Sequence, residues 1–270
     1  MSAPTVAVLI PVWQDPAGFL TSLQSLAGQQ ADLEVIAVDD GSPVPLSTTD
    51  LPRLTFPVTI LRQQRNQGIE AALNRGIEHI AEAGHTYIAR LDAGDRCLAG
   101  RLEQQVTRMQ LQPELALLGT GARFVAADGR VAFRHRPPVD EQAIRRAMRI
   151  NCCFCHPTVM MRTAAVIAVG GYRTAYPAAE DYDLFMRLMA AGYATANLAD
   201  ELVETEYDPQ GISLRRRRRQ LASRLRIQMR EFAPLEPASW SGIAKTLVLA
   251  ATPQGVVRRL KTALMGGQPE

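Results

Sequence analysis

The stretch Thr86-Tyr87-Ile88-Ala89-Arg90-Leu91-Asp92-Ala93-Gly94-Asp95-Arg96 places two carboxylates directly after a short apolar run. The apolar run predicts a buried strand, so the two acids lie where that strand ends. Carboxylates at such an edge are suited to holding a divalent cation against phosphate oxygens. The alternative is a plain turn, because Asp-Ala-Gly-Asp is also favourable turn sequence.

Strand and helix patterns alternate on both sides of this stretch up to about residue 110. Strand patterns cover 5–12, 33–38, 58–61 and 87–91, and helix patterns cover 19–26, 69–80 and 98–109. Regular alternation of this kind predicts an α/β fold with three layers around a mainly parallel sheet. Binding groups of such sheets lie beyond the carboxyl ends of the strands.

Two acidic segments therefore come to the same edge of the predicted sheet. Asp39-Asp40-Gly41-Ser42 follows the second strand, and Asp92 and Asp95 follow the fourth. A carboxylate of the first segment can accept the imide N–H of a uracil, although Asp-Gly turns at strand ends are also common. We expect the two segments to converge.

The second half of the chain is less regular. Strand patterns cover 115–120, 123–125, 131–134, 156–161, 194–198 and 202–207, and helix patterns cover 140–150 and 180–191. Glu180-Asp181 opens the second of these helices, and a carboxylate there can serve as a general base. The alternative is that the acids only stabilise the helix N-terminus.

Charge is distributed unevenly along the chain. Residues 215–270 hold 12 Lys or Arg and 3 Asp or Glu, a net charge of +9 in a chain whose total is +3. A basic helical segment with Trp240 and apolar neighbours makes an anionic membrane surface a candidate partner of residues 211–265. The region has few aromatic side chains to stack on bases, so we expect no nucleic acid partner.

No apolar run approaches the ~20 residues needed to cross a bilayer, and Met1–Thr5 lacks the basic start of a secretory signal. We therefore expect a cytoplasmic protein, peripheral on the inner face of the membrane if the basic segment binds lipid. Cys152, Cys153 and Cys155 crowd beside His156, but a structural zinc site normally takes two separated ligand pairs. Buried thiols are the favoured interpretation of these cysteines.

Taken in order, these segments resemble family 2 glycosyltransferases of the GT-A fold over about residues 4–210. The resemblance is carried by Val-Leu-Ile-Pro-Val (8–12), Val-Asp-Asp-Gly-Ser (38–42), Arg-Asn-Gln-Gly-Ile (65–69), Ala-Leu-Asn-Arg-Gly-Ile (72–77), Ala-Arg-Leu-Asp-Ala-Gly-Asp (89–95), Arg-Leu-Glu (101–103), His-Pro (156–157), Gly-Gly-Tyr-Arg (170–173) and Ala-Glu-Asp-Tyr-Asp-Leu (179–184). It implies a catalytic domain at 1–210, with a nucleotide-binding half at 1–112 and an acceptor half at 113–210. Residues 211–270 then form a basic, amphipathic helical extension.

The resemblance also implies an activity. A sugar would pass, with inversion, from a nucleotide-diphosphate donor, for which UDP is the first choice, to a hydroxyl of a glycan or lipid-linked acceptor in cell-surface polysaccharide biosynthesis. Mn²⁺ or Mg²⁺ would assist, held by Asp95 and Asp92, and Asp181 would be the catalytic base. The donor would contact Pro11, Val12, Asp40, Asn66, Gly68, Arg90, Asp92 and Ala93, and the acceptor side would include His156, Gly171 and Glu180.

Two positions depart from the family pattern. The acidic motif of the family usually reads Asp-x-Asp-Asp, whereas this chain has Gly94 at the third position. Trp13 stands where a smaller Tyr or Asn is common. One carboxylate is therefore missing, which leaves two alternatives open: altered metal dependence, or a catalytically impaired nucleotide-sugar-binding homologue. A nucleotidyltransferase is a weaker alternative, because no glycine-rich phosphate loop follows the first strand.

Overall fold

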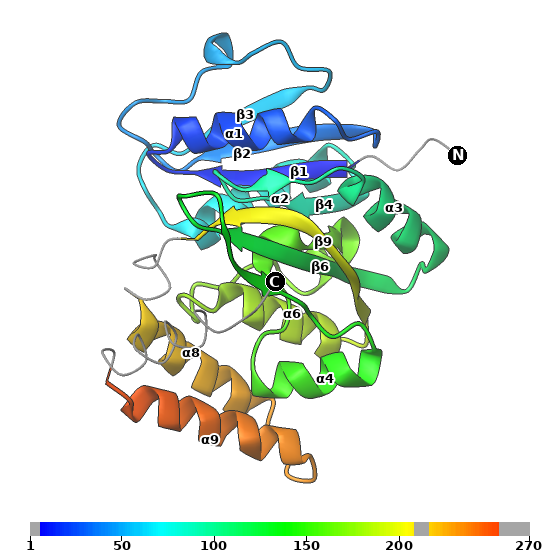
Figure 1. The fold of residues 1–270 in the computed structure, drawn as a ribbon, viewed down its shortest axis with the longest axis vertical. Helices are drawn as coiled ribbons and strands as arrows, with labels where there is room; N and C mark the ends of the chain where they lie inside the picture. The colour runs from blue at the N-terminus through cyan, green and yellow to red at the C-terminus, as the bar shows by residue number, and fades with distance from the viewer. Residues whose placement is uncertain (1–5, 208–215, 254–270) are drawn as a thin grey trace.

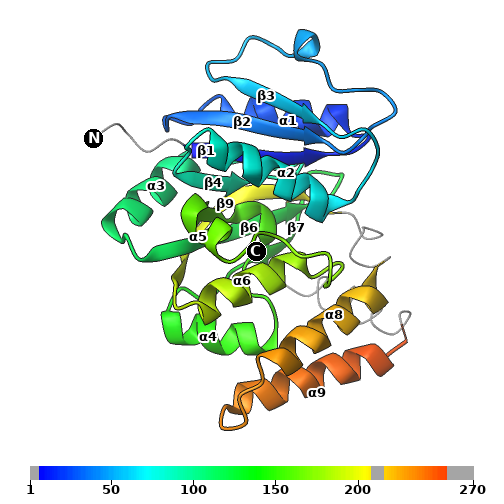
Figure 2. The same ribbon diagram turned by 180° about the vertical axis from the view of Figure 1, so that it is seen from behind.

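The computed structural model describes residues 6–207 and 216–253. Within these residues a nine-stranded sheet carries helices on both faces (Figures 1 and 2). The strands are β1 (Val6–Val12), β2 (Leu33–Asp39), β3 (Val58–Arg62), β4 (Tyr87–Arg90), β5 (Arg96–Cys97), β6 (Leu115–Val125), β7 (Val131–His135), β8 (Met160–Arg162) and β9 (Ala194–Glu206). The helices are α1 (Pro16–Leu26), α2 (Ile69–Glu82), α3 (Arg101–Leu111), α4 (Glu141–Ile150), α5 (Thr163–Ala168), α6 (Glu180–Ala190), α8 (Arg217–Arg230) and α9 (Pro237–Ala251).

The strands lie in the order β3-β2-β1-β4-β8-β6-β9-β5, with β7 paired to β6. The first four are mutually parallel, as the sequence predicts. β2 and β4 flank β1 on opposite sides, so the chain changes direction across the sheet between β1 and β4. Ligands of open α/β sheets bind in the crevice at such a reversal.

The second half of the sheet is mixed. β8 runs antiparallel to both β4 and β6, while β6 and β9 are parallel to each other. The fold is thus the predicted α/β arrangement with a mainly parallel sheet, extended by antiparallel pairs in the second half of the chain.

Two apolar cores cover the faces of the sheet, because alternate residues of each buried strand point to opposite sides. On one face, Val8 and Ile10 of β1 pack with α1 and α3. On the other, Leu9 packs with α2, α5 and α6. α2 lies so close to β1 that a Cβ at Gly76 would stand 2.2 Å from Leu9 Cδ1.

Several predicted boundaries were wrong. Residues 156–161 are not one strand: a 3₁₀ turn at His156–Thr158 precedes β8, because Pro157 has no N–H to give and the Thr158 N–H bonds to the Cys155 carbonyl at 2.9 Å. Each of β6 and β9 had been predicted as two strands. The predicted breaks correspond to register shifts near Gly119 and Gly121, which the strands pass without ending. β5, a two-residue strand, and α5, a six-residue helix, were not predicted.

α8 packs against α6 and the end of α4 through polar contacts. Arg230 forms an ion pair with Asp183 of α6 at 2.6 Å, and Gln228 donates to the Ile150 carbonyl at 3.0 Å. Within the helical extension predicted for 211–270, α8 begins at Arg217. Residues 208–215 and 254–270, with Arg215, Arg258, Arg259 and Lys261, lie outside the described residues. Within the described helices, none is both long and apolar enough to cross a membrane.

Candidate active site

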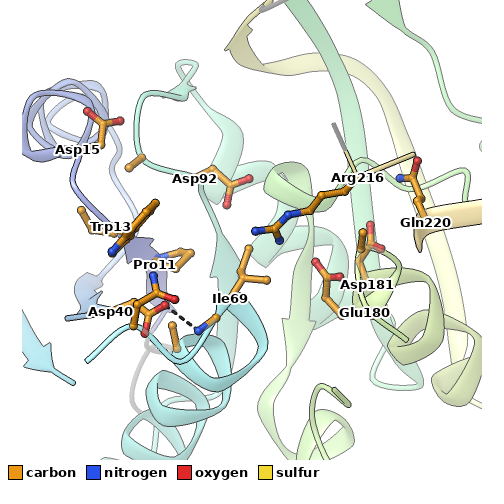
Figure 3. A pocket seen from close by; sticks show the side chains of 16 residues that line it. Pro11, Trp13, Asp15, Asp40, Ile69, Asp92, Glu180, Asp181, Arg216 and Gln220 are labelled. Carbon is orange, nitrogen blue, oxygen red and sulfur yellow. Dashed lines mark hydrogen bonds between the residues drawn. The ribbon is translucent and has the colours of Figure 1, made fainter. Parts of the chain in front are cut away.

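A cavity of about 550 Å³ opens beyond the carboxyl ends of β1 and β4, at the reversal of strand order (Figure 3). Its wall combines strand ends of the first half with the start of α6 and of α8. The lining residues are Pro11, Val12, Trp13, Asp15, Asp40, Asn66, Gly68, Ile69, Ala72, Asp92, Ala93, Ala178, Glu180, Asp181, Arg216 and Gln220. The structure therefore brings together nine of the predicted site residues: Pro11, Val12, Asp40, Asn66, Gly68, Asp92, Ala93, Glu180 and Asp181.

Asp40 is the most firmly held acid of the cavity. One carboxylate oxygen accepts hydrogen bonds from the Gln67 N–H at 2.8 Å and from Gln63 Nε2 at 2.9 Å. The other accepts the Gly68 N–H at 2.9 Å, the bond drawn at Asp40 in Figure 3. Asp40 thus fastens the segment that leads into α2 and still faces the cavity.

The loop after β2 and the loop before α2 approach each other closely, and each contains a glycine with a positive φ angle. Gly41 has φ +71°, and a Cβ there would stand 2.3 Å from the carbonyl carbon of Arg65. Gly68 has φ +93° directly before α2. Both backbone conformations favour glycine strongly. The two loops therefore meet closely, which brings Asn66 and Gly68 to the cavity beside Asp40.

Arg90 does not line the cavity, although it was predicted to contact the donor. Its side chain is fully buried, and its guanidinium donates to the carbonyls of Leu9 and Leu91 and forms an ion pair with Asp92. The Asp92 side chain is 40% exposed and reaches the cavity. Arg90 acts behind Asp92 and orients its carboxylate.

Ser22 of α1 ties down the turn that follows β4. Its hydroxyl donates to the carbonyls of Asp92 and Asp95, at 3.0 and 2.8 Å, and accepts the Gly94 N–H at 3.1 Å. Gly94 has φ +95°, so a side chain at this position would strain the backbone. A Cβ there would lie 4.0 Å from Asp15 Oδ2. The carboxylate of Asp15 thus stands next to the space that a side chain at position 94 would enter.

Asp95 is turned away from the cavity. It is 5% exposed, it does not line the cavity, and its Oδ2 has no hydrogen-bond partner among the described residues. Burial and the nearby charge of Asp92 raise the pKa of Asp95. The structure therefore does not bring Asp95, the predicted metal ligand, to the cavity wall.

Glu180 and Asp181 form the opposite wall, at the first turn of α6 (Figure 3). Glu180 is 8% exposed, and its Oε2 has no partner among the described residues. Asp181 accepts the Tyr182 N–H at 2.7 Å. Burial raises the pKa of both side chains, and the charge of Asp181 adds to the rise for Glu180. Raised carboxyl pKa values suit general base catalysis near neutral pH.

His156 and Gly171 lie outside the cavity. His156 Nε2 accepts the Tyr172 hydroxyl at 2.7 Å, and burial together with the charge of Arg90 lowers the pKa of His156 to about 3. The backbone of Tyr172 is joined to Asn74 of α2 by two hydrogen bonds of 2.8 Å. Asn74 Nδ2 donates to the Tyr172 carbonyl, and the Tyr172 N–H donates to Asn74 Oδ1. These motif residues connect the second half of the chain to the first. Of the three residues predicted for the acceptor side, Glu180 lines the cavity, whereas His156 and Gly171 do not.

Several lining residues were not predicted as donor contacts. Trp13 is 52% exposed and follows β1 directly, and Asp15 caps α1 by accepting the Gly18 N–H at 2.8 Å. Arg216 and Gln220 come from the start of α8. Residues 215–219 are five successive arginines, and this run is the only sequence signal for Arg216. The run does not indicate which arginine side chain points into the cavity.

The carboxylates present fit a small divalent cation only in part. Mg²⁺ is usually held by one or two carboxylates together with substrate phosphates and water, and Asp92 and Asp15 provide two such groups in the cavity. Over residues 6–207 and 216–253, no three His, Cys, Asp or Glu side chains are arranged to hold a metal without a substrate. The four cysteines are free thiols, and burial raises the pKa of each.

Comparisons with known proteins agree on the class of this site. The profile described as "Glycosyl transferase family 2" matches residues 7–170. The amylovoran biosynthesis glycosyltransferase AmsE of Erwinia amylovora is 31% identical over 216 residues, which cover 78% of this chain and 79% of AmsE.

Two solved structures share the fold at low identity. S. aureus TarS 1-349 in complex with UDP-GlcNAc superposes with a TM-score of 0.63 at 16% identity, covering 90% of this chain and 71% of the other. The mannosyltransferase PcManGT of Pyrobaculum calidifontis, in complex with GDP-Man and Mn²⁺, gives a TM-score of 0.62 at 16% identity, covering 99% and 82%. These likenesses confirm the expected GT-A fold.

Proposed function

The chain belongs to glycosyl transferase family 2 and is a glycosyltransferase, and on this premise we propose that it transfers a sugar from a nucleotide-diphosphate donor, with UDP as the first candidate, to a hydroxyl of a glycan or lipid-linked acceptor. The observation that carries the proposal is a cavity lined by hydrogen-bonded or ion-paired acids at the strand ends and by buried acids at the start of α6. The similarity to AmsE, an amylovoran biosynthesis glycosyltransferase, favours a role in polysaccharide biosynthesis.

The donor would lie along the strand-end wall. The Oδ2 of Asp40 accepts one hydrogen bond from the described residues, so we expect it to accept an N–H of the nucleobase as well, while the half-exposed Trp13 offers an aromatic face for stacking. Pro11, Val12 and Asn66 supply the remaining surface. The diphosphate would then extend toward Asp92 and Ala93, and the sugar toward α6.

The acceptor hydroxyl would be activated by Asp181. The hydroxyl oxygen forms a bond to the anomeric carbon as the bond from that carbon to the diphosphate oxygen breaks, and the hydroxyl proton passes to the Asp181 carboxylate. Attack from the face opposite the leaving group inverts the anomeric centre. Glu180, beside the base, would contact the acceptor sugar.

A divalent ion fits the cavity as part of the donor complex. Bound Mn²⁺ or Mg²⁺ would neutralise charge that develops on the leaving diphosphate. Asp92 would hold it, with Asp15 as the second carboxylate in place of a side chain at position 94. Asp95 would support the turn from below and would not coordinate.

The test is product analysis of the purified chain with a panel of UDP-, GDP- and TDP-sugars, with Mn²⁺, with Mg²⁺ and with EDTA. Release of a nucleoside diphosphate that depends on donor and is lost in Asp181→Asn supports the proposal. Release of pyrophosphate would indicate a nucleotidyltransferase. Donor binding by calorimetry without turnover on any acceptor would indicate the impaired homologue.

We further propose that α9 brings the enzyme to an anionic membrane surface, where a lipid-linked acceptor would be reached. Trp240, Leu247 and Val248 are exposed on this helix, and the arginine-rich helix α8 packs against it. Co-sedimentation of the full chain with phosphatidylglycerol vesicles, and not with phosphatidylcholine vesicles, is expected. Replacing the three apolar residues by Gln should release the protein, and unchanged binding would contradict the proposal.

A further inference from the structure

Arg216 is the one basic side chain among the residues that line the cavity. Figure 3 shows its guanidinium pointing into the cavity, toward the space between Asp92 and Glu180. Within the described residues it forms no ion pair, whereas Arg217, next in the chain, donates to the carbonyls of Leu249 and Thr252. The cation is therefore positioned in the cavity without a protein counter-ion in the described part of the chain.

Acidic side chains outnumber basic ones among the residues that line the cavity. Five carboxyl side chains line it, namely those of Asp15, Asp40, Asp92, Glu180 and Asp181. A nucleoside diphosphate adds further negative charge on entry and on departure, so such a wall repels it unless cations intervene. One divalent ion held by two carboxylates leaves part of this charge uncompensated.

α8 is anchored firmly enough to hold an arginine at this place. Asp183 pairs with Arg230 near the end of the helix, and the Ser223 hydroxyl donates to the Pro177 carbonyl at 3.0 Å. Ile227 is fully buried in the core beneath α6. The start of α8 thus comes to the cavity as part of the catalytic body, and Gln220, one turn further, lines the same wall.

We propose that Arg216 contacts the diphosphate of the nucleotide-sugar donor and stabilises the nucleoside diphosphate as it leaves. A guanidinium presents paired N–H groups that match two phosphate oxygens, and such charge-assisted hydrogen bonds are the stronger ones. The inference rests on the proposed function and deepens it: the helical extension, outside the segment matched by the family profile, supplies part of the donor site.

Calorimetry of UDP, GDP and uridine binding to the full chain, with and without Mn²⁺, tests this. Arg216→Gln is compared with Arg218→Gln, which removes the same charge two residues away from an exposed side chain that does not line the cavity. Arg216→Gln should weaken binding of the preferred diphosphate roughly 10-fold and leave uridine binding as it is in the wild type. Arg218→Gln should match the wild type, and Arg216→Lys should recover part of the loss.

Thermal unfolding separates this effect from folding. Arg216→Gln should unfold like the wild type, while Arg217→Gln, which loses the contacts to α9, should unfold at a lower temperature. Equal diphosphate binding by wild type and Arg216→Gln, equal weakening in Arg218→Gln, or a loss confined to the KM of the acceptor would each overturn the inference. A wild type that binds no nucleoside diphosphate would instead overturn the proposed function, and the inference with it.

Discussion

The two walls of the cavity hold their acids in opposite ways. At the strand-end wall, Asp40 receives three hydrogen bonds and Asp92 is paired with the buried Arg90. At the α6 wall, Glu180 has an oxygen without a partner among the described residues, and Asp181 receives one short-range backbone bond. Hydrogen bonds and ion pairs fix the geometry of a carboxylate, whereas desolvation without such partners favours its protonated form.

This contrast separates binding from chemistry. A donor is recognised best by groups whose positions do not change, because ordering costs then do not reduce affinity. A proton acceptor needs a pKa near the working pH, and burial at the start of α6 provides that for Asp181. The wall at the strand ends would hold the donor and the wall at α6 would carry out the transfer.

The largest effect should come from removing the base. Asp181→Asn keeps the size of the side chain but cannot accept the acceptor proton, so kcat should fall by roughly 10²–10⁴-fold. Donor binding should be retained, because it is proposed to depend on the strand-end wall and on Arg216. Rates with a verified acceptor and calorimetry with UDP measure the two quantities separately.

Glu180→Gln is the matched control on the same wall. Since Glu180 is expected to contact the acceptor and not to take its proton, this variant should mainly raise the KM for the acceptor. Full transfer by Asp181→Asn, or equal loss of kcat in both variants, would contradict the assignment of the base.

The pH dependence of kcat/KM should reflect the raised pKa of the buried Asp181 carboxyl at the α6 wall. Burial raises the pKa of Asp181 to about 6, and the charge of Asp92 acts in the same direction. The base works only when ionised, so kcat/KM should rise with pH up to about 6 and fall about tenfold per unit below it. An aspartate with an ordinary pKa would keep its activity to a much lower pH.

Thermal unfolding at each pH shows whether the protein is still folded where activity falls. A profile that stays flat to pH 5 in folded protein would show that no desolvated carboxylate limits the reaction. Donor binding measured over the same range is the comparison, because it does not require a proton to pass to the Asp181 carboxylate.

The parallel half of the fold was predictable because its strands are continuous β-branched runs, buried on both faces. The mixed half was less so, since β6 and β9 pass register shifts that look like strand ends in the sequence. β5 has two residues and owes its pairing to β9 alone. No local pattern encodes such a partner.

Four of the five cavity acids were predictable, because each follows a strand or opens a helix: Asp40, Asp92, Glu180 and Asp181. What could not be predicted was the direction of a side chain within a motif. Arg90 and Asp95 belong to the same turn as Asp92, yet only Asp92 faces the cavity. Trp13, Asp15 and Arg216 reach it through a loop or helix whose docking depends on contacts distant in the sequence.

A smaller effect is expected from loosening the strand-end wall. Asp40→Ala leaves the Gln67 and Gly68 N–H groups without their acceptor, which should cost about 1–3 kcal/mol of unfolding free energy. Nucleotide binding should weaken in parallel, because the segment before α2 would no longer be fastened. Urea unfolding and UDP calorimetry test this, with the exposed Asp50→Ala as the control that should change neither.

An effect of similar size, confined to nucleotide binding, should come from Trp13, whose ring offers stacking and no charge. Trp13→Leu should weaken UDP binding by roughly 1–3 kcal/mol without changing kcat at saturating donor. The chain has two tryptophans, and the other, Trp240, is exposed on α9 away from the cavity. Quenching of fluorescence by UDP should therefore persist in Trp240→Leu and disappear in Trp13→Leu. Quenching that persists in Trp13→Leu and disappears in Trp240→Leu would place the uracil ring away from Trp13. It would also contradict the proposed hydrogen bond between uracil and Asp40.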